Sequence, residues 1–148
     1  MRLLCKLLLV VLVAEAATTR EATVRAAVAT TARRSAGSRS NGKCAKFVAD
    51  AIDSALGVTL VRHESAKDLG GSLIKVGFSV VPSNNYEDGD VVIFSGIPNK
   101  HPHGHVQVRA GDKWISDFVQ SGFYPSEAYR TVGKHTCYRW FETHRIEL

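Results

Sequence analysis

Apolar residues recur every three or four positions in two segments of the first third of the chain, and this spacing is typical of amphipathic helices. The first segment spans 18–34, and the second runs from about Gly42 to Leu56 and stops at Gly57. A glycine just beyond a periodic segment is a common helix end, because glycine adopts the left-handed conformation at little cost. The pattern predicts two helices joined by a loop at 35–42. The buried stripe of the second helix would consist of Phe47, Val48, Ala51, Ile52 and Ala55.

Beyond Gly57 the pattern changes to short β-branched or fully apolar runs that are bounded by turn residues. These runs predict five strands, and a further short helix is expected at 65–73. The expected strands are 78–81, 91–94, 105–110, 114–119 and 138–141. Since the helices precede most of the strands, we expect an α+β fold in which the N-terminal helices pack on a small antiparallel sheet.

The first 16 residues have the composition of a secretory signal peptide. Arg2 and Lys6 provide positive charge, an apolar run follows at 7–13, and Ala14-Glu15-Ala16 is a small-x-small cleavage pattern. A buried helix is the alternative interpretation. We therefore expect a signal peptide at 1–16 and one domain at 17–148, secreted and extracellular. No later segment is long and apolar enough to insert in a membrane.

The chain is basic, with a formal net charge of +5 at pH 7. A positive surface favours anionic partners, such as bacterial wall polymers. The basic residues concentrate between Arg20 and Lys46 without a nucleic-acid-binding motif, so we interpret them as a solvated helix face and linker. We expect a monomer that binds no nucleic acid.

Three cysteines are present, and Cys5 would leave with the signal peptide, so Cys44 and Cys137 remain. Cys44 lies in the first turn of the second expected helix, where free N–H groups and the helix dipole favour a thiolate. Lys43 adds a neighbouring positive charge. This setting predicts a nucleophilic cysteine. A disulfide between Cys44 and Cys137 is the alternative, because secreted proteins fold in an oxidising compartment.

A histidine suited to act as a base opens the strand expected at 105–110. His105 ends the segment His-Pro-His-Gly-His, and the alternation of the strand turns Val106 and Val108 to the core. His105, Gln107 and Arg109 would then share the opposite face. Gln107 and Arg109 are therefore candidates for holding a substrate carboxylate.

A cysteine–histidine pair needs a third polar group that orients the imidazole, and Asp117 on the next strand is the candidate. A two-residue turn at 111–112 would put Asp117 on the wrong face of the hairpin. A loop one residue longer pairs Gln107 with Asp117 and puts the carboxylate on the His105 face. We expect the longer loop. With a two-residue turn, Ser116 or a backbone carbonyl would become the candidate instead.

Four segments together resemble known cysteine peptidases. These are Asn-Gly-Lys-Cys-Ala-Lys-Phe-Val-Ala-Asp-Ala-Ile at 41–52, Gly-Asp-Val-Val-Ile-Phe at 89–94, Gly-His-Val-Gln-Val at 104–108 and Tyr-Arg-Trp at 138–140. They look like the CHAP and NlpC-type peptidases of the papain-like class and, more narrowly, bacterial type VI secretion amidase effectors. With its signal peptide, the chain is similar to the domesticated amidase effectors of ticks and other arthropods, especially those of the second effector family.

The resemblance implies a papain-like fold and an antibacterial enzyme that cuts peptide bonds in peptidoglycan without a cofactor. Cys44 would match the nucleophile of the family, His105 the base and Asp117 the third member. The second effector family is associated with the crosslink between the diamino acid and D-alanine, and we expect that bond here. The thiolate would attack the amide carbonyl, and His105 would protonate the leaving amine.

Two other functions stay open at this point. His103 and His105 lie two residues apart on one strand face, a spacing that can chelate zinc, as in a zinc-dependent wall endopeptidase. The upstream ligands that such enzymes need are not matched, since Lys67 follows His63 at the spacing where an acid is required. The chain could also be a secreted wall-binding protein without activity, closed by the Cys44–Cys137 disulfide.

Overall fold

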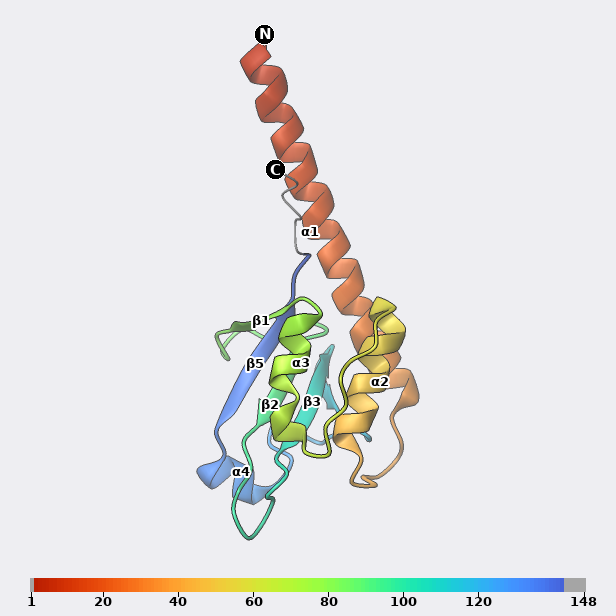
Figure 1. Ribbon diagram of the computed structural model, residues 1–148, viewed down its shortest axis with the longest axis vertical. Coiled ribbons are helices and arrows are strands. Elements are labelled where there is room, and N and C mark those ends of the chain that lie inside the picture. The colour runs from red at the N-terminus through yellow and green to blue at the C-terminus, as the bar shows by residue number, and fades with distance from the viewer. Residues whose placement is uncertain (1, 143–148) are drawn as a thin grey trace.

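The computed structural model describes the backbone of residues 2–142 and the side chains of residues 19–142 (Figure 1). A long helix comes first and a five-stranded sheet occupies most of the second half. In chain order the elements are α1 (Arg2–Ser35), α2 (Cys44–Leu56), a 3-10 turn (Ala66–Asp68), α3 (Gly70–Lys75), β1 (Phe78–Val81), β2 (Val91–Phe94), β3 (His105–Ala110), β4 (Lys113–Ile115), α4 (Glu127–Val132) and β5 (His135–Trp140).

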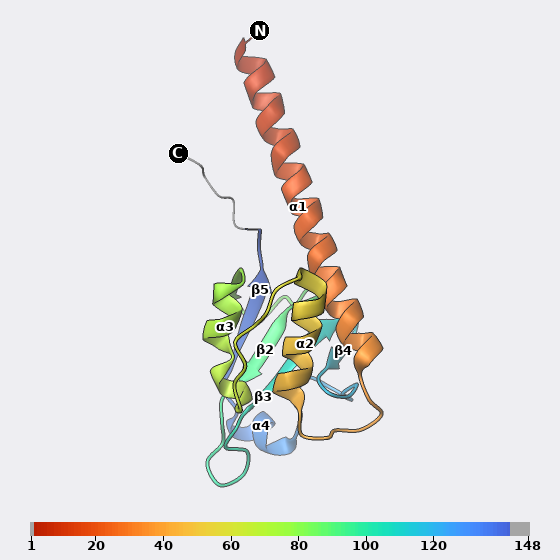
Figure 2. The ribbon, with the colours of Figure 1, turned by 45° about the vertical axis from the view of Figure 1, so that its right-hand side comes forward.

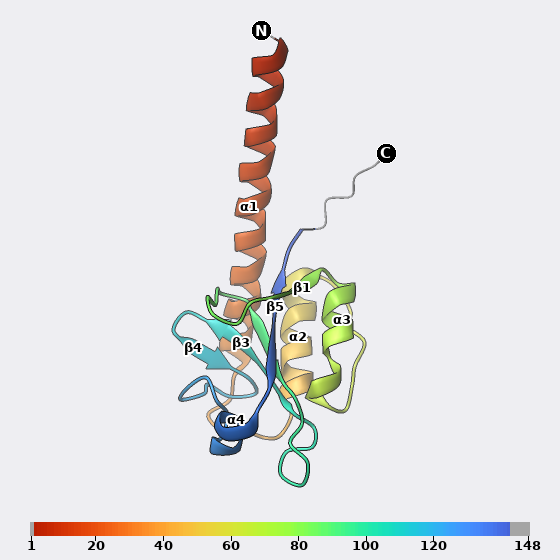
Figure 3. The same cartoon turned by 90° about the vertical axis from the view of Figure 1, so that its left-hand side faces the viewer.

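The five strands form one antiparallel sheet in the order β1-β5-β2-β3-β4. Strand β5 lies between β1 and β2 and pairs with both, so it connects β1 to the rest of the sheet. Helices α2 and α3 lie side by side over one face of the sheet, and the C-terminal half of α1 packs beside α2 (Figures 2 and 3). The short helix α4 lies near the end of the sheet at which α2 begins.

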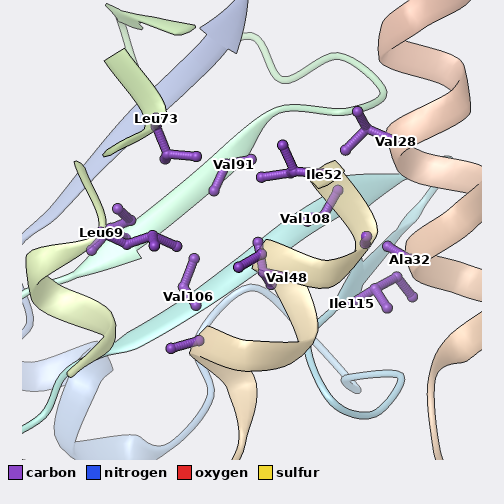
Figure 4. Close-up of a cluster of buried hydrophobic side chains, with 14 of the residues drawn as sticks. Val28, Ala32, Val48, Ile52, Leu69, Leu73, Val91, Val106, Val108 and Ile115 are labelled. Carbon is purple, nitrogen blue, oxygen red and sulfur yellow. The ribbon is translucent and has the colours of Figure 1, made fainter. Parts of the chain in front are cut away.

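The main core lies between these helices and the sheet (Figure 4). Val48 and Ile52 of α2 project into the middle of this cluster, and both are fully buried. The odd-numbered residues of β2 and the even-numbered residues of β3 meet them, as the period of two in a strand requires. This packing fixes α2, and with it the residue at its first position, against β3.

The opposite face of the sheet carries a second apolar cluster. Phe94, Trp114 and Cys137 point to this side and are covered by the segment that follows β4, including Tyr129 of α4. The aromatic rings contact one another, with a centroid distance of 5.2 Å between Phe94 and Tyr129. Both faces of the sheet are therefore covered, at least in part.

The α+β class, the antiparallel sheet and the packing of the N-terminal helices agree with the sequence. The expected strands at 78–81, 91–94 and 105–110 have the observed bounds, and α2 ends at Leu56. Gly57 has a φ of 68°, and its N–H donates to the Asp53 carbonyl (2.8 Å), which closes the helix. The last strand is longer than expected, and α4 was not expected.

The hairpin between β3 and β4 differs from the prediction. Ala110 pairs with Lys113, so the turn has two residues, Gly111 and Asp112, and the expected loop of three residues is wrong. Strand β4 also ends at Ile115 instead of Val119, because the Ser116 N–H donates to the Phe118 carbonyl and turns the chain back on itself. Both differences change the residues that surround His105.

Helix α1 runs without a break from Arg2 through the predicted cleavage pattern at 14–16. Met1 and the side chains of 2–18 lie outside the described residues, and the signal peptide remains a prediction. Among the described residues, none of the helices combines the length and the apolar character that a membrane span requires.

Candidate active site

A cavity of about 620 Å³ opens where the N-terminus of α2 meets the start of β3. Cys44 and His105 both line it, so the structure brings the predicted nucleophile and base to one site. Other lining side chains come from the loop before β3, from the turn after β4 and from α4. They include His101, His103, Asp117 and Tyr129.

Cys44 is the first residue of α2 and is only partly exposed. Three backbone N–H groups surround its sulfur and favour its charged form, namely those of Val106, Ala45 and Cys44 itself. Val106 follows His105 directly, so the sulfur lies at the start of β3, next to the residue that carries the imidazole. No hydrogen bond joins the Cys44 sulfur to the His105 ring within the described residues.

A glycine sets the position of His105. Gly104 has a φ of 69°, a conformation that other residues rarely adopt, and a side chain there would collide with the Phe94 carbonyl. The chain can therefore pass close to the end of β2 and enter β3 with His105 facing the second cluster. His105 is half-buried there, with its ring 6.3 Å from that of Phe94.

The His105 ring is held by a glutamine that the sequence analysis did not select. His105 Nε2 lies 2.6 Å from Gln120 Oε1. The Gln120 amide nitrogen donates to Gln107 Oε1 (2.7 Å) and to the Gly122 carbonyl (3.2 Å). Gln107 in turn donates to the Phe123 carbonyl (2.9 Å). Both glutamines are buried, so this chain of hydrogen bonds is shielded from water.

The two backbone carbonyls at the end of this chain fix its polarity, because a carbonyl oxygen only accepts hydrogen bonds. Gln107 must present its NH₂ to Phe123 and its oxygen to Gln120. Gln120 must then present its NH₂ to Gln107 and its oxygen to His105. The imidazole therefore carries its proton on Nε2, which leaves Nδ1 as the basic nitrogen.

Asp117 lines the cavity together with His105, but among the described residues its carboxylate forms no hydrogen bond with the His105 ring, so its role as the orienting residue stays a prediction. The two-residue turn puts it on the other face, as the register argument requires. Its Oδ2 accepts hydrogen bonds from the Asn41 N–H (2.6 Å), the Lys43 N–H (3.4 Å) and the Ser40 hydroxyl (3.2 Å). Asp117 therefore anchors the loop that leads into Cys44. Within the described residues, the partner of the His105 ring is Gln120, and neither Ser116 nor a backbone carbonyl takes that position.

The structure places Gln107 and Arg109 away from the cavity, and their substrate contacts stay predictions. Both share a strand face with His105, but the segment after β4 covers that face. Gln107 is fully buried and belongs to the hydrogen-bond chain behind His105. The Arg109 guanidinium lies over the Trp114 ring at 5.3 Å, and neither residue lines the cavity.

Cys44 and Cys137 are both free in this structure. Cys44 packs against the main core, whereas Cys137 lies on the opposite face of the sheet in the second cluster. The Cys44–Cys137 disulfide of the wall-binding alternative is therefore not formed.

His103 and His105 have separate partners. His103 Nδ1 pairs with the Ser65 hydroxyl (2.7 Å), and His105 pairs with Gln120. Within the part of the chain whose side chains are described, no three histidine, cysteine or acidic residues cluster as metal ligands would. A catalytic zinc site normally has three protein ligands, so the described side chains give the zinc alternative no site.

Comparison with solved structures relates this fold to bacterial effectors. The effector in the native type VI effector–immunity complex Tae3–Tai3 from Ralstonia pickettii is 39% identical, with a TM-score of 0.72, over 78% of this chain and 98% of that chain. The selenomethionine form of that complex matches with 39% identity and a TM-score of 0.70, over 76% and 98% of the two chains. This chain belongs to the Tae3 effector family.

The Tae3 match supports the type VI effector part of the predicted resemblance. It points to Tae3 instead of the second effector family, and the arthropod and CHAP/NlpC parts remain predictions. Ly7917, solved with the hydrolysing product of MDP, shares the fold at 22% identity and a TM-score of 0.50, over 79% of this chain and 62% of that chain. No protein-family model and no curated protein matches the chain.

The sequence of this Tae3-family chain does contain a signal for Gln120. Ser116-Asp117 directly follows the apolar pair Trp114-Ile115, and serine and aspartate favour turns. A turn there brings the next residues back beside β4, and the Gln120 N–H indeed donates to the Trp114 carbonyl (2.9 Å). The return places Gln120 behind His105.

The protonation states of Cys44 and His105 differ from the stable Cys44 thiolate that the sequence predicted. Burial raises the pKa of the Cys44 thiol and outweighs the Val106 N–H, which lowers it, while the negative charge of Asp117 raises it further. Burial also lowers the pKa of His105 and outweighs the hydrogen bond to Gln120. Both shifts favour a neutral thiol beside a neutral imidazole in the resting protein.

We therefore expect alkylation of Cys44 by iodoacetamide to be slow at neutral pH and to accelerate only above the ordinary thiol pKa. The raised pKa delays formation of the thiolate, which is the reactive form. Mass spectrometry of the native protein, sampled over time at each pH, gives the rate at Cys44 separately from that at Cys137. A rate that is already maximal at mildly acidic pH would instead indicate a thiolate–imidazolium pair.

Proposed function

We propose that this chain is a peptidoglycan amidase in which Cys44 is the nucleophile and His105 the general base. One observation carries the proposal. Cys44 at the head of α2 and His105 at the start of β3 line the same cavity, and the backbone N–H of Val106, next to His105, favours the charged form of the Cys44 sulfur. Membership of the Tae3 effector family and the resemblance to amidase effectors support a peptide bond of the bacterial wall as the substrate.

The chemistry follows from the protonation states of the pair. His105 Nδ1 accepts the thiol proton as the sulfur bonds to the carbonyl carbon. The tetrahedral intermediate collapses, the C–N bond breaks, and His105 returns the proton to the leaving amine. Water then loses a proton to His105 and attacks the thioester, which releases the new carboxylate and restores the thiol. No cofactor takes part in these steps.

The finer parts of the proposal rest on the sequence. The signal peptide at 1–16 would export residues 17–148 as a monomer that acts outside the cell on bacteria, with an antibacterial effect. We keep the crosslink between the diamino acid and D-alanine as the bond cut; the sequence resemblance attached this bond to the second effector family, whereas the solved structures match Tae3. The net positive charge of the chain would favour binding to anionic wall polymers.

Digestion of purified sacculi tests the proposal directly. Residues 17–148 should convert crosslinked muropeptides into products with one new amine and one new carboxylate, identified by mass spectrometry. EDTA should leave the reaction unchanged, and alkylation of Cys44 should stop it. Loss of activity with EDTA alone would favour the zinc alternative. Binding to sacculi without new products would favour the wall-binding alternative.

A further inference from the structure

Tyr129 occupies a wall of the same cavity and has no role in the mechanism described so far. It lies on α4 and is only 3% exposed, yet it lines the cavity with Cys44 and His105. Its ring stacks on that of His101 at 5.0 Å and lies 6.3 Å from that of His105. The ring of Phe94 supports it from the sheet at 5.2 Å. Three rings therefore hold the phenol in one place.

The hydroxyl of this tyrosine is unusual because it has no hydrogen-bond partner in the described part of the chain. A buried tyrosine normally pairs its hydroxyl, but none of the described residues forms a hydrogen bond with that of Tyr129. In the described part of the chain, every side-chain oxygen or nitrogen that is fully shielded from solvent does have a partner. The Tyr129 hydroxyl is therefore accessible to solvent. The solvent-filled space that Tyr129 lines is the cavity.

The hydroxyl stays protonated under all ordinary conditions and can therefore donate a hydrogen bond. Burial raises the pKa of Tyr129 to about 12, and the second cause is repulsion from a charged Cys44. The repulsion agrees with the geometry, because Tyr129 and Cys44 line the same cavity. An uncommitted donor thus faces the space in which a carbonyl attacked by Cys44 would lie.

We propose that the Tyr129 hydroxyl donates a hydrogen bond to the oxyanion of the tetrahedral intermediate, alongside the backbone N–H of Cys44. The inference rests on the proposed function, since it needs Cys44 to attack a carbonyl. A donor held in place before the reaction stabilises the developing charge without reorganisation, and this is the source of its effect. Tyr129 is then a catalytic residue that comes from α4, an element separate from those of the nucleophile and the base.

Tyr129→Phe removes the hydroxyl and keeps the ring that packs on Phe94 and His101. We expect kcat on a soluble crosslinked muropeptide to fall by about 100-fold, with KM nearly unchanged, because the hydrogen bond forms only in the transition state. Tyr124→Phe is the matched control. Tyr124 packs in the second cluster without lining the cavity, and this variant should keep wild-type kcat.

A peptide aldehyde gives a second measurement, because the thiohemiacetal that it forms with Cys44 resembles the tetrahedral intermediate. Tyr129→Phe should weaken inhibition by the aldehyde about as much as it lowers kcat, and leave inhibition by the matching peptide alcohol unchanged. A folded Tyr129→Phe protein with wild-type kcat and wild-type aldehyde affinity overturns the role of Tyr129 alone. A wild-type protein that forms no muropeptide products overturns the proposed function itself.

Discussion

Cys44→Ala should abolish hydrolysis of peptidoglycan, with a loss of at least about 10⁴-fold in kcat. Removal of a nucleophile eliminates the covalent route, and the binding site and oxyanion donors that remain give little rate by themselves. The change deletes one sulfur atom from a half-buried position at the first turn of α2, so the fold should persist. Release of muropeptides from sacculi, measured over hours by liquid chromatography, is sensitive enough for this range.

Cys137→Ala is the matched control for the loss of a thiol. Cys137 is buried on the opposite face of the sheet, and burial raises its pKa to about 12, so it cannot act as a nucleophile near neutral pH. This variant should retain activity, although it loses some packing in the second cluster. Circular dichroism and thermal melting must show both variants folded. Lysis by a folded Cys44→Ala protein would refute the nucleophile.

The parts of the fold that were predicted are those in which a local pattern coincides with tertiary packing. Helix α2 has an apolar stripe with a glycine at its end, and β2 and β3 are apolar runs bounded by turn residues. The helical and strand periods then predicted which side of each element is buried, and this placed Cys44 against β3. The prediction of Cys44 and His105 at one site used only these patterns and the order of the elements.

The face of Asp117 could not be predicted, because it depends on the length of one turn. A change of one residue in the Gly111-Asp112 turn moves every later side chain to the other face. Helix α4 was missed for a related reason. It has six residues, too few for a helical period to be detected, and its position depends on tertiary contacts of Tyr129.

The charge state of Cys44 shows where an argument from local structure fails. The helix N-terminus does stabilise the thiolate, and the N–H groups of Ala45 and Cys44 contribute to this. The sequence could not show how deeply the packing of Cys44 against the main core buries the sulfur, or that Asp117 places a negative charge nearby. Desolvation exceeds the stabilising contacts, so the thiol is expected to lose its proton only as His105 accepts it.

Gln120→Leu should lower kcat by about 10³-fold, the second-largest effect expected in this protein. The change removes the acceptor that keeps the proton on Nε2 of His105, so the tautomer with a basic Nδ1 is no longer favoured. It also leaves Gln107 Oε1 without its donor. The effect should appear in kcat and not in KM, because Gln120 does not line the cavity in which the substrate would bind.

The pH profile of kcat/KM separates an orienting role of Gln120 from a merely structural one. The hydrogen bond to Gln120 raises the pKa of His105, so Gln120→Leu should move the acid limb of the profile to lower pH. Gln120→Glu keeps an acceptor and adds a negative charge, which favours the imidazolium. It should recover part of the lost kcat and move the acid limb to higher pH. An unshifted acid limb in both variants would contradict the orienting role.

Asp117→Asn decides between the two candidates for the third residue. Its carboxylate anchors the loop before Cys44, so the amide should lower the thermal stability of the protein and retain the His105 tautomer. Loss of the negative charge should also lower the pKa of Cys44 and make the thiol easier to alkylate. A fall in kcat larger than that of Gln120→Leu would return the orienting role to Asp117. A larger fall in kcat for Gln120→Leu than for Asp117→Asn would mean that Gln120 orients the imidazole. The turn after β4 brings this glutamine beside His105.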